Sequence, residues 1–201
     1  MDWAAYIADK AKTKSIIDSR SVATELNLPI DLVRRALRRQ ENRGLVEHVA
    51  PKLYINKLSV GFSSKDLTNK LWPDCYISLD SALHEWGISS QAPVSLTCVA
   101  TKQIPEVKTN SVRIIFRTIN RSLFWGFIEK TTKYDTYKIA DREKAFLDWI
   151  YFRRKDVLPI DFYEFHLRDL SRSKLMEYSA KYPRVLQQEL YPILIQHQFA
   201  A

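Results

Sequence analysis

The chain is poor in the residues that mark several classes of protein. It has only four glycines among 201 residues and no low-complexity run, which argues against extensive disorder. Its two cysteines, Cys75 and Cys98, form neither a disulfide framework nor a CxxC pair, as expected in a reducing cytoplasm. No run approaches 18 apolar residues, and the start lacks the basic and apolar regions of a signal peptide. We therefore expect a cytoplasmic protein with no membrane partner.

The sequence also lacks the usual signatures of catalysis and metal binding. Its four histidines are far apart and show no ligand spacing, and there is no glycine-rich phosphate loop. A nucleotidyltransferase would need paired aspartates after a Gly-Ser turn to hold Mg²⁺, and none follows Gly61-Phe62-Ser63-Ser64. We therefore expect no enzyme activity, no catalytic residue, no metal and no cofactor.

What the chain has in excess is positive charge. Its net charge is +8 and its isoelectric point about 9.4, which favours a nucleic acid, an anionic membrane surface or an acidic partner, in that order. Residues 1–57 hold 11 basic against 7 acidic side chains, and residues 58–201 hold 20 against 16. The N-terminal quarter is therefore the more basic part per residue.

Residues 1–57 follow the order of a winged helix-turn-helix domain. Apolar residues recur at helical spacing after Trp3, Pro29 is well placed to begin a third helix, and Gly44 to end it. Two short β-prone runs around Ala50-Pro51-Lys52 then indicate a hairpin. Three helices followed by a hairpin is the winged-helix order. The expected helices cover residues 3–14, 21–26 and 29–43, and the expected strands cover residues 45–49 and 53–55.

The most informative stretch is Arg34 to Arg39, on the third expected helix. At 100° per residue, Val33, Leu37 and Gln40 fall on one side, and four arginines with Asp31 cover the other. Such a face suits the readable edges of duplex DNA, although a solvated charged face is the alternative interpretation. Gln40 stands where a leucine is expected, so we expect it to be hydrogen-bonded at the domain boundary or exposed to the second domain.

The winged-helix prediction assigns DNA-binding roles by position. The N-terminal part of the recognition helix lies nearest the base edges, and its later residues meet phosphates. An aspartate there could accept a hydrogen bond from the amino group of cytosine. Alternatively, its carboxylate is simply stabilised by the positive end of the helix dipole. The start of the second helix offers phosphate ligands, and the hairpin tip offers a wing contact. The candidate base readers are Ile30, Asp31, Arg34 and Arg35; the candidate phosphate ligands are Arg38, Arg39, Arg43, Ser19, Arg20 and Ser21; the wing residue is Lys52.

The remaining chain reads as a linker or a loosely packed connecting helix over 58–72 and a mixed α+β domain over 73–201, so the predicted fold class is α+β. Ser78 can cap a helix that Gly87 ends, and Asp141 can cap another. The last 40 residues indicate a helical tail broken by prolines. The expected helices cover residues 79–86 and 142–152, the expected strands cover 93–101, 112–119 and 134–139, and the breaking prolines are Pro159, Pro183 and Pro192.

Two segments of this domain carry a resemblance to a known family. Residues 76–88 read YISLDSALHEWGI, and residues 137–148 read YKIADREKAFLD. Together with the winged helix before them, they resemble the AbiEi family of antitoxins from abortive-infection, type IV toxin–antitoxin systems. That family has a "SAL…G" helix and an "EKALLD" helix in this order. The resemblance covers most of residues 15–152.

The resemblance implies two functions. The N-terminal domain would bind repeats in its own promoter and repress the operon, and the C-terminal domain would counter a nucleotidyltransferase toxin, without a stable complex between the two proteins. The alternative interpretation of the signature residues is structural, since Glu143 suits a first helical turn and Lys144 with Asp148 makes an i, i+4 pair. The signature positions carried over are Ser81, Leu83, Glu143, Lys144 and Asp148.

Two alternatives remain open at this stage. Pro73-Asp74 and Glu106-Val107-Lys108 outline a PD…ExK nuclease, in which carboxylates hold Mg²⁺ and a lysine assists the attacking water. Glu106 is expected in a loop between strands rather than on a strand. The other alternative is a transcription regulator with a ligand-sensing C-terminal domain and no toxin partner.

Overall fold

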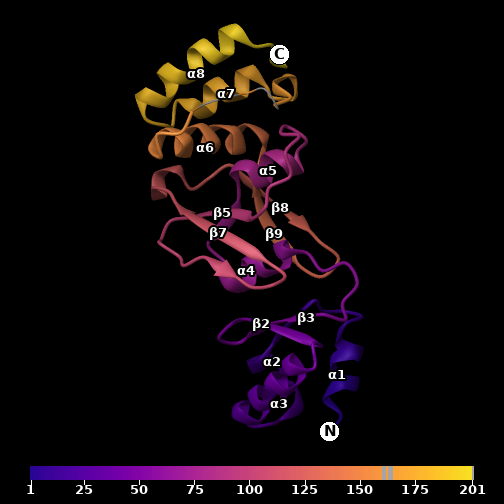
Figure 1. The fold of residues 1–201 in the computed structure, drawn as a ribbon. Helices are drawn as coiled ribbons and strands as arrows, with labels where there is room; N and C mark the ends of the chain where they lie inside the picture. The colour runs from indigo at the N-terminus through magenta and orange to yellow at the C-terminus, as the bar shows by residue number, and fades with distance from the viewer. Residues whose placement is uncertain (160–161, 163–164, 201) are drawn as a thin grey trace. The chain divides into compact units, whose positions relative to one another are not determined.

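The computed structural model describes residues 1–159, 162 and 165–200 (Figure 1), and its fold class is α+β, as the sequence predicts. The chain forms two compact units. The N-terminal unit comprises Met1–Pro73 together with two later segments, Val107–Arg113 and Thr131–Tyr137, and the C-terminal unit comprises Asp74–Glu106, Ile114–Lys130 and Lys138–Ala201. Within the described residues, no helix is both long and apolar enough to cross a membrane.

The N-terminal unit combines short helices with a three-stranded sheet of order β1-β3-β2. Asp2 caps α1 through the amides of Ala4 and Ala5, and Asp18 caps α2 through the amide of Arg20. Gly44, with φ +76°, follows the end of α3, as its position in the sequence predicts. The elements are α1 (Trp3–Lys10), β1 (Ile16–Asp18), α2 (Ser19–Leu26), α3 (Ile30–Asn42), β2 (Val46–Ala50), β3 (Leu53–Asn56), η1 (Ser64–Leu67) and α4 (Thr68–Leu71).

The helices of this unit pack on one apolar core, which buries the apolar side of α3 that the sequence pattern indicates. Val33, Ala36 and Leu37 have no solvent exposure. Burial of side chains of this size stabilises a fold by about 1.5–3 kcal/mol each. The core residues are Trp3, Ile7, Ile17, Val22, Val33, Ala36, Leu37, Val46 and Tyr54.

Two parts of this unit differ from the sequence prediction. The strand β1 was not expected, because three residues are too few to show a period of two. Residues 58–72 were expected to be a linker or a loosely packed helix, but they form η1 and α4, and the side chains of Asp66 and Leu67 are buried. The Asp66 carboxylate accepts hydrogen bonds from the Ser15 hydroxyl (2.7 Å), the Ser63 amide and the Thr132 hydroxyl. Residues 58–72 are therefore part of the unit.

The segment 107–113 joins the N-terminal unit through Glu47 of β2. The Glu47 carboxylate accepts hydrogen bonds from the amide (3.1 Å) and hydroxyl of Ser111, and Lys57 lies 3.4 Å away. Burial raises the pKa of Glu47, but hydrogen bonds from Ser111 and Thr109 outweigh it and lower this pKa to about 2. The hairpin strand β2 is thus held by a segment some sixty residues later in the chain.

The C-terminal unit is built around a mixed sheet and the helix α6. The sheet order is β6-β7-β5-β4-β9-β8, in which β4 pairs antiparallel with β5 and parallel with β9, and β5 pairs parallel with β7. The elements that follow α4 are β4 (Cys75–Ile77), α5 (Leu79–Glu85), β5 (Leu96–Ala100), β6 (Val107–Lys108), β7 (Arg113–Thr118), η2 (Arg121–Leu123), β8 (Phe127–Thr131), β9 (Thr136–Ala140), α6 (Arg142–Lys155), η3 (Leu167–Asp169), α7 (Arg172–Ser179) and α8 (Arg184–Gln196). Of these, β6 belongs to the N-terminal unit, as do the first residue of β7, the last residue of β8 and the first two residues of β9.

The helix α6 packs against both α5 and α7 (Figure 1), so most of its circumference is buried. The helical tail is present as α7 and α8, but Pro192 lies inside α8 and does not break it. A proline removes one backbone hydrogen bond. Buried Leu186 and Leu190 before Pro192, and Ile193 and Leu194 after it, hold the helix on both sides. Part of the connection after Pro159 lies outside the described residues.

The contacts of Glu47 predict a stability loss in acid. The pKa of this carboxyl is lower in the folded protein than its ordinary value of 4.5, so its contribution is complete above pH 4.5 and is lost as the pH falls towards 2. At pH 7, Glu47→Gln should lower the free energy of unfolding by about 2 kcal/mol, because hydrogen bonds to a charged acceptor are replaced by weaker ones. Urea unfolding of the wild type and the variant at pH 7 and pH 3 measures this.

The difference between the two proteins should shrink at pH 3. Glu129→Gln, which changes an exposed carboxyl, is the control and should unfold like the wild type at pH 7. An equal difference at both pH values would contradict the role of the Glu47 charge.

Candidate nucleic-acid interface

The arginine-rich side of α3 is exposed in the structure. Asp31, Arg35, Arg38, Arg39 and Arg43 are exposed, and Arg34 is half-buried. The buried side of the helix includes Gln40, which is only 4% exposed. The helix therefore has the two faces that the sequence predicts.

Near the start of α3, arginines surround one carboxylate. The Arg34 guanidinium lies 3.8 Å from the Asp31 carboxylate, and Arg35 Nε donates to the Asp31 backbone carbonyl at 3.3 Å. The buried Arg34 Nε has no hydrogen-bond partner among the described residues. Asp31, Arg34, Arg35 and Arg38 together line one surface hollow. Three guanidinium groups and one carboxylate therefore line this hollow, which leaves it with an excess of positive charge.

Two arginines farther along α3 and the arginine that follows its last residue have no ion pair with any described residue: Arg38, Arg39 and Arg43. Their guanidinium groups are free to meet an external anion. Exposed arginine side chains with this freedom are the usual ligands of DNA phosphates. Ile30, at the first position of the helix, is half-buried and offers only an apolar contact.

The prediction for Gln40 is wrong in both its forms. The side chain is buried inside the N-terminal unit, so it is not exposed to a second domain, and its Oε1 has no hydrogen-bond partner within the described part of the chain. The Gln40 backbone carbonyl accepts from the amides of Arg43 and Leu45, which closes α3 and begins the following turn. Nothing in the structure explains why this position carries a glutamine side chain.

The start of α2 is a poorer phosphate site than the sequence predicts. Ser19 has no solvent exposure, so its hydroxyl cannot reach DNA, and that prediction is wrong. Arg20 and Ser21 are exposed, but the Asp18 carboxylate already accepts the Arg20 amide at 2.8 Å. Lys52 in the hairpin turn lies 3.8 Å from the same carboxylate. A phosphate at this helix end would meet the negative charge of Asp18.

The signature residues lie in the C-terminal unit, where Lys144 and Asp148 form a fully buried pair. The Lys144 ammonium lies 2.7 Å from Asp148 Oδ1 and also donates to the Leu123 carbonyl (2.8 Å) and the Tyr182 hydroxyl (2.7 Å). Asp148 Oδ2 accepts from the hydroxyls of Tyr76 and Ser78, both at 2.9 Å. The i, i+4 pair is as predicted, but its burial is not visible in the sequence.

Burial sets the ionisation of this cluster. It lowers the pKa of Lys144, and the neighbouring Asp148 carboxylate partly offsets this by stabilising the ammonium. Burial raises the pKa of Tyr76 and of Tyr182 well above the ordinary value, and the Asp148 charge acts in the same direction. Both phenols are therefore neutral and donate to the carboxylate.

A glycine is required next to this cluster. A Cβ on Gly126 would lie 3.0 Å from Lys144 Cγ, and the residue has φ +73°.

Ser78 was expected to cap α5, but its side chain makes no capping hydrogen bond and donates to Asp148 instead. Leu79 after it has φ +54°, an uncommon conformation for a leucine. The Ser78 hydroxyl is thus used to bind the carboxylate rather than to cap α5.

The other signature residues are also buried. The Ser81 hydroxyl donates to the Ser95 carbonyl and accepts from the Thr97 amide, and Leu83 has no exposure. The Glu143 carboxylate accepts the Ser171 amide (3.0 Å) and lies 2.8 Å from Lys174. These contacts join α5 to the strand β5, and α6 to α7. Sequence reasoning missed Tyr76 and Tyr182 as partners, and their tyrosine identity alone gave no signal.

Asp74 and Glu106, the carboxylates of the alternative nuclease interpretation, belong to no group of side chains that could hold a metal ion among the described residues. Asp74 and Glu106 are exposed, and Glu106 precedes the short strand β6, in no helix or strand, as the sequence predicts. In the described part of the chain, no group of three or more histidine, cysteine or acidic side chains could hold a metal ion. Cys75 and Cys98 are both buried.

The buried pair predicts a large cost for removing one partner. Lys144→Met leaves the Asp148 carboxylate buried without its counter-charge and should lower the free energy of unfolding by about 3–5 kcal/mol. Lys155→Met changes an exposed lysine of the same helix and should cost no more than about 0.5 kcal/mol. Urea unfolding followed by circular dichroism compares the two. Similar losses in both variants would contradict a special role for the Lys144 contacts.

Comparison with known proteins adds no assignment to this geometry. No protein-family model matches the chain, and no curated protein matches it. The function is therefore argued from the residues and their arrangement.

Proposed function

We propose that this protein is a winged-helix transcription repressor that binds duplex DNA through α3. The observation that carries the proposal is the row of exposed guanidinium groups on one face of a helix whose opposite face is buried. The arrangement of α2, α3 and the β2–β3 hairpin supports a winged helix-turn-helix, in which the second helix of the pair enters the major groove. The net charge of +8 favours the same partner.

Positions along α3 divide the DNA contacts into two kinds. Arg35 and Asp31, at the N-terminal end, would read base edges, and a bidentate arginine–guanine contact contributes about 1–3 kcal/mol of discrimination. Arg38, Arg39 and Arg43 would neutralise phosphates. Arg34 contributes less than its position suggests, because its Nε is buried and cannot donate to DNA.

We also propose that the protein is a cytoplasmic antitoxin that represses its own operon. The support is the resemblance of the α5 and α6 segments to the AbiEi family, and the partner would be a nucleotidyltransferase toxin. The buried state of Lys144 and Asp148 indicates that these signature residues act by maintaining the fold of the C-terminal unit rather than by touching a toxin. A toxin contact, where one exists, would then use other residues.

The DNA-binding proposal predicts different effects for the two ends of α3. Arg35→Ala should reduce the preference for operator over random DNA about tenfold, because one base contact is lost. Arg38→Ala with Arg39→Ala should weaken binding to both DNAs and flatten the dependence of log K on log salt by about 2, because two phosphate contacts are lost. Fluorescence anisotropy at several salt concentrations measures both quantities.

Arg142→Ala, an exposed arginine of the C-terminal unit, is the control and should bind DNA as the wild type does. Unchanged affinity, specificity and salt dependence in both α3 variants would overturn the proposal.

The antitoxin proposal predicts protection without DNA binding. Full-length protein carrying Arg35→Ala, Arg38→Ala and Arg39→Ala should still rescue growth when co-expressed with a toxic nucleotidyltransferase encoded by the adjacent gene. Substitution is preferable to deletion of residues 1–57, because segments 107–113 and 131–137 belong to the same compact unit. Failure of the wild-type protein to rescue growth would contradict the antitoxin role while leaving the repressor role open.

A further inference from the structure

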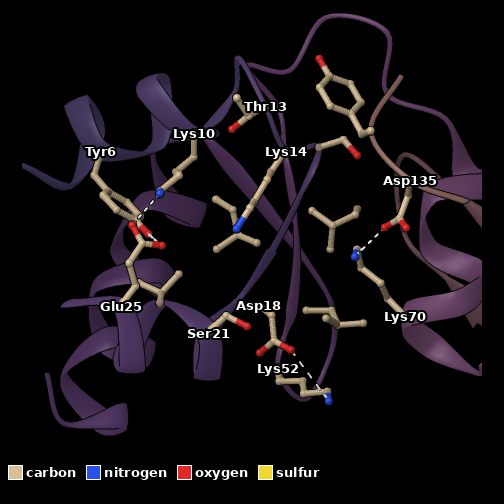
Figure 2. A pocket seen from close by; sticks show the side chains of 16 residues that line it. Tyr6, Lys10, Thr13, Lys14, Asp18, Ser21, Glu25, Lys52, Lys70 and Asp135 are labelled. Atoms are coloured by element: carbon tan, nitrogen blue, oxygen red, sulfur yellow. Dashed lines mark hydrogen bonds and ion pairs between the residues drawn. The ribbon is translucent and has the colours of Figure 1, made fainter. Parts of the chain in front are cut away.

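A cleft of about 400 Å³ lies within the N-terminal unit (Figure 2), and none of the residues that line it belongs to α3. Its walls come from α1, β1, α2, the hairpin turn, α4 and the segment 131–137. The volume falls within the usual range for binding sites of about 300–1,000 Å³. The proposed DNA contacts on α3 use none of its residues.

The cleft follows the open edge of the sheet. β1 is the outer strand in the order β1-β3-β2, and it contributes Ile16, Ile17 and Asp18 to the lining. Successive side chains of a strand point to opposite faces of a sheet, so a cavity lined by all three surrounds the strand edge. Two residues line the cleft from the helical side: Val22, which belongs to the apolar core, and Tyr6, which packs against that core.

The register of β1 decides which backbone groups face the cleft. The Ser19 amide donates to the Lys52 carbonyl and the Asn56 amide donates to the Ser15 carbonyl, both at 2.8 Å. In an antiparallel pair such bonds recur at alternate residues, so 15, 17 and 19 bond towards β3. The Ile16 amide and carbonyl and the Asp18 amide therefore point away from β3, towards the open edge. An extended chain laid along this edge would find donors and acceptors at strand spacing.

The charges of the cleft favour an occupant with one carboxylate. Four lysines and three carboxylates line it. Each carboxylate forms an ion pair with one lysine: Glu25 is 2.5 Å from Lys10, Asp135 is 2.5 Å from Lys70, and Asp18 is 3.8 Å from Lys52. The charge of Lys14 also acts on the Glu25 carboxylate, without an ion pair between the two.

The fourth lysine, Lys14, has no ion pair among the described residues. Figure 2 shows its ammonium in the middle of the cleft, between the Lys10–Glu25 and Lys70–Asp135 pairs. The hydroxyls of Thr13 and Ser21 also line the cleft. One acidic side chain placed beside Lys14 would balance the charge of the lining.

We propose that this cleft binds an extended acidic peptide segment, which adds as a short strand to the edge of β1 and places a carboxylate beside Lys14. Main-chain hydrogen bonds along an exposed edge provide affinity in this mode of recognition, and side-chain contacts provide selectivity. β1 has three residues, so the bound segment is about three residues long. A peptide is favoured over a small organic anion because the outward backbone groups of residues 16 and 18 match a peptide backbone.

The test uses full-length ¹⁵N-labelled protein and the capped tripeptide acetyl-Val-Glu-Val-amide, followed by NMR titration. Saturable shifts are expected at the amides of Ile16 and Asp18. The same peptide with N-methylated backbone amides should bind at least tenfold more weakly, because it cannot donate to the strand edge. Acetyl-Val-Gln-Val-amide should bind about three- to fivefold more weakly than the acidic peptide.

Two variants separate the charge from the fold. Lys14→Gln should remove the preference for the glutamate peptide over the glutamine peptide, while Lys12→Gln, an exposed lysine that pairs with Asp9 outside the cleft, should retain it. Absence of saturable shifts at Ile16 and Asp18, or equal binding of the N-methylated peptide, overturns the proposal. Acetate producing the same shifts at the same concentration also overturns it and identifies a small-anion site.

Discussion

The buried ion pair of Lys144 and Asp148 is the interaction on which the C-terminal unit depends. An ammonium and a carboxylate without solvent are stable only when their remaining hydrogen-bonding capacity is satisfied. Here the ammonium also donates hydrogen bonds to the Leu123 carbonyl and the Tyr182 hydroxyl. The carboxylate accepts hydrogen bonds from the hydroxyls of Tyr76 and Ser78. The pair therefore connects α6 to β4, to η2 and to the segment before α8.

In the N-terminal unit, too, carboxylates that accept several hydrogen bonds hold distant segments together. Glu47 holds the segment 107–113 against β2, and Asp66 joins the residues before β1 to the segment 131–137. The helices and hairpin that carry the arginine face are thus completed by segments from the second half of the chain. A boundary drawn at residue 57 would remove these contacts, so the N-terminal unit is better treated as residues 1–73 with the two later segments.

Within this unit, two surfaces have different chemistry. The exposed side of α3 gathers guanidinium groups with few partners, as a polyanion ligand requires. The edge of β1 instead presents backbone groups, and its flanking charges are nearly balanced. The first surface suits a long, repetitive phosphate backbone, and the second suits a short extended segment.

The sequence by itself determined the local features: the two faces of α3, the end of that helix at Gly44, the Asp141 cap of α6 and the pairing of Lys144 with Asp148. These depend on residues within a few positions of one another, whose periodicity and capping chemistry are readable. Only the tertiary structure decided the burial of Ser19 and Gln40, the strand β1, the packing of residues 58–72 and the hydroxyl partners of Asp148. Those features depend on residues such as Tyr76, Thr132 and Tyr182, which lie far away in the chain. Contacts of that kind form only when distant segments pack together, so no local pattern records them.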